Sequence, residues 1–199
     1  MINSVAIIDG GGANIASLQY ALQRLGAKSH LTSDPSAIQE SSHVILPGVG
    51  AAAPAMAQIH QKELANVILN LKQPVLGICL GMQLMGTSSA EDNVDCLGVF
   101  PDKAIKLKGG PESPVPNMGW CRVSFSSNNP LLQNIPDESW FYFVHSYVLP
   151  ISQRTLGRTS HTHDFSAILK HNNFYATQFH PERSAAAGAQ LLKNFMELN

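Results

Sequence analysis

A cysteine stands between two glycines in the run Gly77-Ile78-Cys79-Leu80-Gly81, directly after the apolar residues Val75-Leu76. This spacing is the thiol version of the nucleophile elbow, in which a strand turns sharply into a helix at the reactive residue. Glycines at minus two and plus two suit such a turn, because side chains there would clash with neighbouring strands. The new helix directs its amide dipoles at the sulfur and so favours a thiolate. The alternative is that Cys79 is a small apolar residue that ends a core strand, since free cysteines are often buried.

A nucleophilic thiol needs a base, and the base needs a group that orients it. The best candidate among the eight histidines is His180, in Gln178-Phe179-His180-Pro181-Glu182. Pro181 predicts an extended backbone, in which residues two apart point the same way. Glu182 could then accept a hydrogen bond from the imidazole, completing a Cys-His-carboxylate triad with Cys79. The alternative is a simple turn before a helix.

Acyl transfer at Cys79 would also require an oxyanion hole. One donor is expected to be the backbone N–H of Leu80, the residue after the nucleophile. The second is expected at Val49, in the loop Pro47-Gly48-Val49-Gly50 that leaves a neighbouring strand. The same four residues could instead form an ordinary Gly/Pro turn.

Bulk properties exclude several classes of protein. The 199 residues fit one domain, 1–199, and the 44% hydrophobic and 14% charged content is enough for a folded core. A net charge of −1 without basic runs argues against nucleic-acid or membrane partners. Three scattered cysteines suit a reducing, cytoplasmic location, and no signal or membrane-spanning segment is evident. The sequence His161-Thr162-His163-Asp164 lacks further ligands at suitable spacing, so no metal site is predicted.

Short apolar runs alternate with helical patterns in the first half of the chain, which predicts parallel βαβ units. Strands are expected at 5–9, 42–46 and 74–78, and helices over 14–25 and from about 51 to 71. Further strands, antiparallel in character, are expected at 97–107, 120–125, 141–149, 154–160, 165–169 and 174–178. A last helix is expected over 184–198, with Ser184 as its N-cap. The predicted class is α/β, with a doubly wound, mostly parallel sheet, helices on both faces and added antiparallel strands, and with the site at the strand C-termini.

The elbow, the Pro-Gly-Val-Gly loop and the His-Pro-Glu segment resemble those of the class I, triad-type glutamine amidotransferases. Within that class the whole chain is similar to the glutaminase subunits of imidazole glycerol phosphate synthases, enzymes of histidine biosynthesis. The segments that carry this closer resemblance are LPGVG at 46–50, VPNMGW at 115–120, YFVHSY at 142–147 and QFHPERS at 178–184.

The resemblance implies that Cys79 attacks the carboxamide of glutamine and forms a glutamyl thioester, which water then hydrolyses. His180 would give its proton to the departing ammonia, and Glu182 would hold His180. The implied substrate-binding residues are Gly50, Gln83, Glu91, Ser146 and Tyr147. The implied partner-facing residues are Asn14, Asn117, Met118 and Trp120. The implied partner is a (β/α)8-barrel cyclase that receives the ammonia, and no metal or organic cofactor is implied.

Two positions depart from the family pattern. The loop Asp9-Gly10-Gly11-Gly12-Ala13-Asn14 keeps Asp-x-Gly-x-x-Asn but is plainer and more flexible, and it lacks the last glycine of a dinucleotide-binding motif. Asn117 stands where the family commonly has histidine. It could hydrogen-bond across an interface but could not carry a proton.

Ammonia released without the partner is wasted, so we expect a low basal rate of glutamine hydrolysis until the cyclase is liganded. In the free subunit the N–H of the Gly48–Val49 peptide is expected to point away from the oxyanion hole. Two rival interpretations remain open at this stage. The chain could be a glutaminase that serves another synthase, such as those for anthranilate or pyridoxal phosphate, or a catalytically idle regulatory module. The Met-Gly-Trp and Val-His-Ser-Tyr segments disfavour the first rival, and an intact triad disfavours the second.

Overall fold

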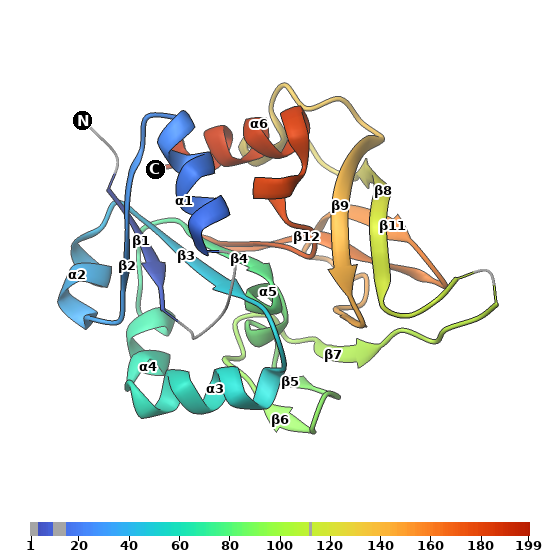
Figure 1. Ribbon diagram of the computed structural model, residues 1–199, viewed down its shortest axis with the longest axis horizontal. Coiled ribbons are helices and arrows are strands. Elements are labelled where there is room, and N and C mark those ends of the chain that lie inside the picture. The colour runs from blue at the N-terminus through green and yellow to red at the C-terminus, as the bar shows by residue number, and fades with distance from the viewer. Residues whose placement is uncertain (1–3, 10–14, 112) are drawn as a thin grey trace.

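The structure, a computed structural model, describes residues 4–9, 15–111 and 113–199 (Figure 1). Asn14 and the glycines at 10–12, which the sequence assigns to the partner-facing loop, lie outside the described residues.

A nine-stranded sheet forms the centre of the molecule, in the order β2-β1-β3-β4-β13-β12-β11-β8-β9. Its first five strands run parallel to one another. These are β2 (Lys28–Thr32), β1 (Ser4–Ile8), β3 (His43–Gly48), β4 (Val75–Cys79) and β13 (Phe174–Thr177). The central strand β4 therefore delivers its C-terminal residue, Cys79, to the edge where loops of neighbouring parallel strands also end.

The other four strands extend the sheet in antiparallel fashion. They are β12 (Asp164–His171), β11 (Thr155–Ser160), β8 (Asn117–Phe125) and β9 (Ser139–His145). A small second sheet pairs β10 (Tyr147–Val148), β7 (Lys103–Lys106), β5 (Ser88–Ser89) and β6 (Val94–Asp95). The predicted class, a parallel sheet with added antiparallel strands, is confirmed.

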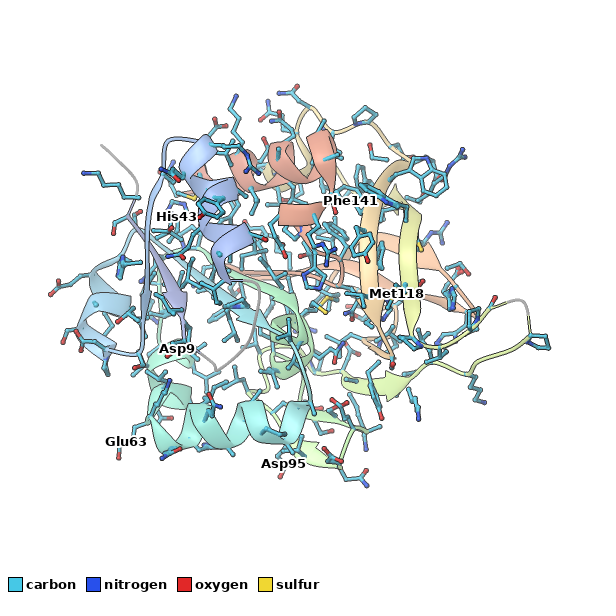
Figure 2. The ribbon with its side chains drawn as sticks, viewed as in Figure 1. Asp9, His43, Glu63, Asp95, Met118 and Phe141 are labelled. Atoms are coloured by element: carbon cyan, nitrogen blue, oxygen red, sulfur yellow. The ribbon has the colours of Figure 1, made fainter. Side chains whose placement is uncertain are left out.

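Helices cover both faces of the sheet (Figure 1). Helices α1 (Ile15–Arg24) and α6 (Ala185–Met196) pack on one face, and α2 (Pro35–Glu40), α3 (Ala52–Gln61), α4 (Leu64–Leu69) and α5 (Leu80–Leu84) on the other. Successive side chains of a strand point to opposite faces, so Val5 and Ile7 of β1 enter the core under α1 and α6, whereas Ala6 and Ile8 enter the other core. The aromatic ring of Phe141, on β9, lies on the α6 side (Figure 2) and stacks on Phe179 at a centroid distance of 4.1 Å.

Strand β2, helix α2 and the two-residue strands β5 and β6 were not predicted from the sequence. Strand β2 is a polar, partly exposed edge strand, so its sequence carries no buried apolar run. Helix α2 has only six residues, and Asp34 caps it by accepting hydrogen bonds from the amides of Ser36 and Ala37, both at 3.3 Å.

Several expectations were wrong in detail. Residues 174–178, expected among the antiparallel additions, form β13, which pairs in parallel with β4. The strand expected over 141–149 divides into β9 and β10. The helix expected from about 51 to 71 breaks into α3 and α4 at Glu63, whose φ is +55°. Of the strand expected over 97–107, only Lys103–Lys106 forms. Ser184 is the N-cap residue of α6, as expected, but its hydroxyl makes no capping bond: it donates to the carbonyl of His180 at 2.7 Å and accepts from the amide of Tyr142 at 2.9 Å. None of the helices in the described ranges is long and apolar enough to cross a membrane.

Candidate active site

Cys79 occupies a strained turn between β4 and α5, with φ +53° and ψ −108°. A Cβ added at Gly81 would collide with the carbonyl oxygen of Leu46 on β3, and one at Gly77 would lie 2.9 Å from the carbonyl oxygen of Gly81. The neighbouring strand therefore requires a glycine only at position 81. At position 77 the crowding comes from the start of the chain's own helix α5.

His180 and Glu182 form the other half of the triad. Nδ1 of His180 lies 2.9 Å from Oε1 of Glu182, and both side chains are more than nine-tenths buried. The expected extended geometry was wrong, because only His180 is extended and Pro181–Arg183 form a 3₁₀ turn. This turn brings the carboxylate back to the imidazole. The alternative of a turn before a helix is thus correct as local structure but does not exclude the triad.

The imidazole of His180 has an unusual electrostatic environment. Burial lowers its pKa, but hydrogen bonding and charge attraction from Cys79 and Glu182 outweigh that effect and raise the pKa of His180 to about 10. Nε2 is buried, and apart from this interaction with Cys79 it has no hydrogen-bond partner in the described part of the chain. The arrangement therefore favours a protonated imidazolium whose Nε2 faces the thiol.

A cavity of about 280 Å³ opens beside the thiol. It holds the triad members Cys79 and His180, together with the remaining predicted residues for substrate and oxyanion binding: Val49, Gly50, Leu80, Gln83, Glu91, Ser146 and Tyr147. Three other residues, Pro116, Val144 and His145, complete its wall. The volume suits a ligand of amino-acid size.

Several of these residues already have partners within the protein. Nε2 of Gln83 donates to the carbonyl of Tyr147 at 2.9 Å, and Oε2 of Glu91 accepts from the amide of Ala52, the first residue of α3, at 2.8 Å. The carbonyl of Ser146 accepts from the amide of Leu107 at 2.8 Å. The cavity wall is therefore held by internal hydrogen bonds before any ligand enters it.

Comparison with known proteins agrees with this geometry. The family model for class-I glutamine amidotransferases matches residues 6–198. The chain belongs to the class-I glutamine amidotransferase family. Two relatives are an imidazole glycerol phosphate synthase subunit HisH from Buchnera aphidicola subsp. Schizaphis graminum, 46% identical over 195 residues, and a HisH 2 subunit from Legionella pneumophila strain Paris, 46% identical over 194 residues. The alignments cover 98% of this chain and 99% and 98% of those proteins.

Solved structures share the amidotransferase fold. One is a putative GMP synthase component from Thermoplasma acidophilum, with a TM-score of 0.78 and 20% identity, covering 99% of this chain and 94% of that one. Another is a glutamine amidotransferase from Thermotoga maritima, with a TM-score of 0.65 and 20% identity, covering 99% of this chain and 82% of that one.

Sequence reasoning missed two polar residues of this amidotransferase's site. Gln178 is fully buried, and its Nε2 lies 3.8 Å from the sulfur of Cys79. His145 lines the cavity, and its Nδ1 lies 3.1 Å from the carbonyl of Tyr147. Both lie inside segments that carry the family resemblance. A polar residue directly after a buried strand was the signal available for Gln178.

The predicted partner-facing residues divide into two groups. Met118 and Trp120 of β8 are 65% and 47% exposed, and Met118 lies on the antiparallel extension (Figure 2). Asn117, however, is only 3% exposed, and its Nδ2 lies 3.1 Å from Nε2 of His145. Its side chain therefore faces the interior rather than the exposed surface.

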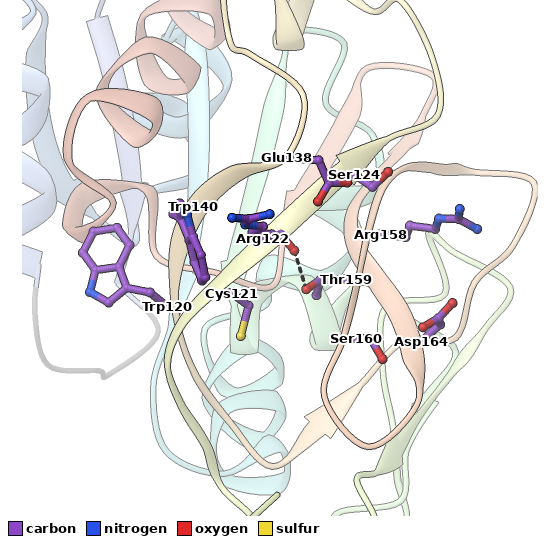
Figure 3. A pocket seen from close by; sticks show the side chains of 10 residues that line it. All are labelled: Trp120, Cys121, Arg122, Ser124, Glu138, Trp140, Arg158, Thr159, Ser160 and Asp164. Atoms are coloured by element: carbon purple, nitrogen blue, oxygen red, sulfur yellow. Dashed lines mark hydrogen bonds between the residues drawn. The ribbon is translucent and has the colours of Figure 1, made fainter.

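A second, shallower hollow of about 480 Å³ lies on the antiparallel extension of the amidotransferase, away from the thiol. Figure 3 shows the side chains of Trp120 and Trp140 at one end of it, and the guanidinium of Arg122 lies 5.0 Å from the centroid of the Trp140 ring. It contains no member of the triad, so we regard it as part of the surface around Met118 and Trp120 rather than as a substrate site.

Proposed function

We propose that this chain is the glutaminase subunit of an imidazole glycerol phosphate synthase, releasing ammonia from glutamine for a partner cyclase. The observation that carries the proposal is a buried His180–Glu182 pair beside Cys79 at a cavity of amino-acid size. Near-complete alignment with HisH subunits supports the choice of synthase.

In the proposed reaction, the sulfur of Cys79 attacks the carboxamide carbon of glutamine, and the C–N bond breaks. The proton on Nε2 of His180 goes to the departing ammonia, while Glu182 at Nδ1 keeps the ring oriented. Water then attacks the thioester with His180 as base, and glutamate leaves. The backbone N–H of Leu80 and the Gly48–Val49 peptide would stabilise the negative oxygen in both steps.

The substrate's α-ammonium group would meet Glu91. One oxygen of this carboxylate is bound to the amide of Ala52, which leaves Oε1 for the ligand. Gln83 would contribute its Oε1 in the same way, since its Nε2 is engaged by Tyr147. Gly50, Ser146 and Tyr147 would complete the contacts from the cavity wall.

The proposed partner is a (β/α)8-barrel cyclase that takes up the ammonia. Met118 and Trp120 form the proposed docking surface, because large apolar side chains exposed together are typical of protein interfaces. The low basal rate and the turning of the Gly48–Val49 peptide on partner binding remain part of this proposal. So does a cytoplasmic location, where the three free thiols would stay reduced.

The deciding experiment is to measure glutamate release by the purified chain alone and with the partner cyclase and its nucleotide ligand. A large rise with the liganded cyclase is expected. Cys79→Ala should abolish glutamine use but retain cyclase binding and synthesis from added ammonium salts. Activity that ignores the cyclase would point to a different synthase. A folded chain without activity, and without covalent labelling of Cys79 by a glutamine-like electrophile, would point to an idle module.

A further inference from the structure

A row of buried polar groups ends on the sulfur of Cys79. It begins at Asn117, whose cross-strand partner in the β8–β9 register is His145, with 3.1 Å between Nδ2 and Nε2. Nδ1 of His145 lies 3.1 Å from the carbonyl of Tyr147. Nε2 of Gln83 donates to the same carbonyl at 2.9 Å and to Oε1 of Gln178 at 3.3 Å.

The last link is Nε2 of Gln178, which donates to Sγ of Cys79 at 3.8 Å. The side chains of the row are all less than 7% exposed, and buried hydrogen bonds are stronger than those in water.

The carbonyl of Tyr147 fixes which groups of the row donate hydrogen bonds and which accept them. The oxygen of Tyr147 can only accept, so His145 must present Nδ1–H and Gln83 must present its amide N–H groups. The second N–H of Gln83 then requires the oxygen of Gln178 to face it. Gln178 is left with its NH₂ group toward the sulfur. Turning either amide around would bring two acceptors or two donors face to face in a buried position.

The sulfur of Cys79 has a second polar neighbour, which favours the protonated thiol rather than the thiolate. The carbonyl of Val144 lies 3.7 Å from Sγ and can interact favourably only with the protonated thiol, which has an S–H to donate. An N–H donor interacts best with the ionised form. Gln178 is the side-chain amide that favours the thiolate, whereas Val144 favours the thiol.

We propose that Gln178 is a further catalytic residue of this amidotransferase: its side-chain amide donates a hydrogen bond to the Cys79 thiolate, and the buried row from Asn117 holds that amide in the donating orientation. This role rests on the proposed function only in that the thiolate is the nucleophile. The geometry of Gln178 is independent of the substrate and of the synthase that is served.

The test measures the reactivity of the thiolate itself. Iodoacetamide alkylation of Cys79 is followed against pH by mass spectrometry of the peptide that contains it, in the wild-type chain and in Gln178→Met, which keeps the length but has no donor. Burial raises the pKa of the Cys96 thiol to about 11 and also raises the pKa of Cys121. Those two thiols therefore react slowly near neutral pH. No lysine or arginine lies between Cys79 and Cys96, so the chain is digested with a protease that cleaves after glutamate, and cleavage at Glu91 places these two residues on separate peptides.

We expect Gln178→Met to slow alkylation of Cys79 at pH 7 about tenfold, because the thiolate loses a hydrogen-bond donor. The matched control is Thr177→Val, which removes a fully buried hydroxyl from the adjacent residue, where Oγ1 donates to the carbonyl of Phe179 at 3.1 Å. It should stay within about twofold of wild type. Should Gln178→Met fail to fold, Gln178→Asn withdraws the amide from the sulfur while keeping its chemistry, and the same direction of change is expected.

An alkylation profile unchanged by the Gln178 substitution in a folded chain would overturn the inference. So would an equal effect of Thr177→Val, because it would indicate general disturbance of the strand end. The assay needs neither glutamine nor cyclase. A chain that releases no glutamate but shows the expected profile would refute the proposed function and leave this inference standing.

Discussion

Protonation of His145 should destabilise the folded protein at mildly acidic pH. The residue is 6% exposed, and burial is the main cause that lowers its pKa to about 4. The nearby His161 and His180 lower the pKa further, whereas the hydrogen bond to the carbonyl of Tyr147 raises it. In the unfolded chain the pKa returns to the ordinary value of 6.5. A gap of about 2.5 corresponds to about 3 kcal/mol of unfolding free energy. Because the folded state favours the neutral ring, this stability is fully present above pH 6.5 and is lost as the pH falls toward 4.

The assay is urea unfolding at several pH values between 7.5 and 4, on wild type and on His145→Gln. Glutamine cannot gain a proton in this range, and its amide can still donate toward the carbonyl of Tyr147. The variant will have a lower unfolding free energy than wild type at pH 7.5, but the difference in unfolding free energy should shrink by about 3 kcal/mol at pH 4. His60→Gln removes an exposed histidine from α3 and serves as the control. It should follow the wild-type curve, since that side chain stays in water in both states.

Parallel pH curves for wild type and His145→Gln would refute the reasoning. They would mean that the folded protein accommodates the charged ring, for example by rotation of the Asn117 amide so that its oxygen faces Nε2. An NMR titration distinguishes the cases, because the ring of His145 should remain neutral well below pH 6.5 if burial dominates.

Three further outcomes are expected. Gly81→Ala should lower the unfolding free energy by about 1–3 kcal/mol and remove most of the glutaminase activity, because the added Cβ has no room. The control is Gly110→Ala, where no atom lies within 4 Å of the added Cβ, and it should leave the melting temperature and activity unchanged. Glu182→Gln should lower the pKa of His180 from about 10 and reduce kcat/KM roughly 100- to 10,000-fold. An NMR titration measures the pKa, and cyclase-stimulated glutamate release measures kcat/KM. Wild-type rates in the variant would rule out a role for Glu182 in orienting His180. Trp120→Ala should weaken cyclase binding about 30-fold or more in calorimetry without altering the fold, and unchanged affinity would mean that the docking surface lies elsewhere.

The sequence alone determined the nature of the chemistry and three of the five parallel strands, since β13 was expected among the antiparallel additions. The elbow at Cys79 can be recognised because its residues lie within five positions of the sequence, although the requirement for glycine at position 81 comes from Leu46 on the neighbouring strand β3. The buried strands β1, β3 and β4 can be predicted because each is a short apolar run. Strand β2 has no such run, since it lies at the sheet edge, and it was missed for that reason.

Tertiary structure alone decided which polar groups surround the thiol. Asn117 and His145 meet because the β8–β9 register pairs them, and Gln178 reaches Cys79 because β13 lies beside β4. Nothing in the separate segments indicates that Asn117 faces inward, whereas its neighbour Met118 faces outward. The reason is physical: a motif specifies backbone and residue type over a few positions, but a buried hydrogen bond between strands depends on register and on which face of the sheet is covered, and both are set only when distant segments pack together.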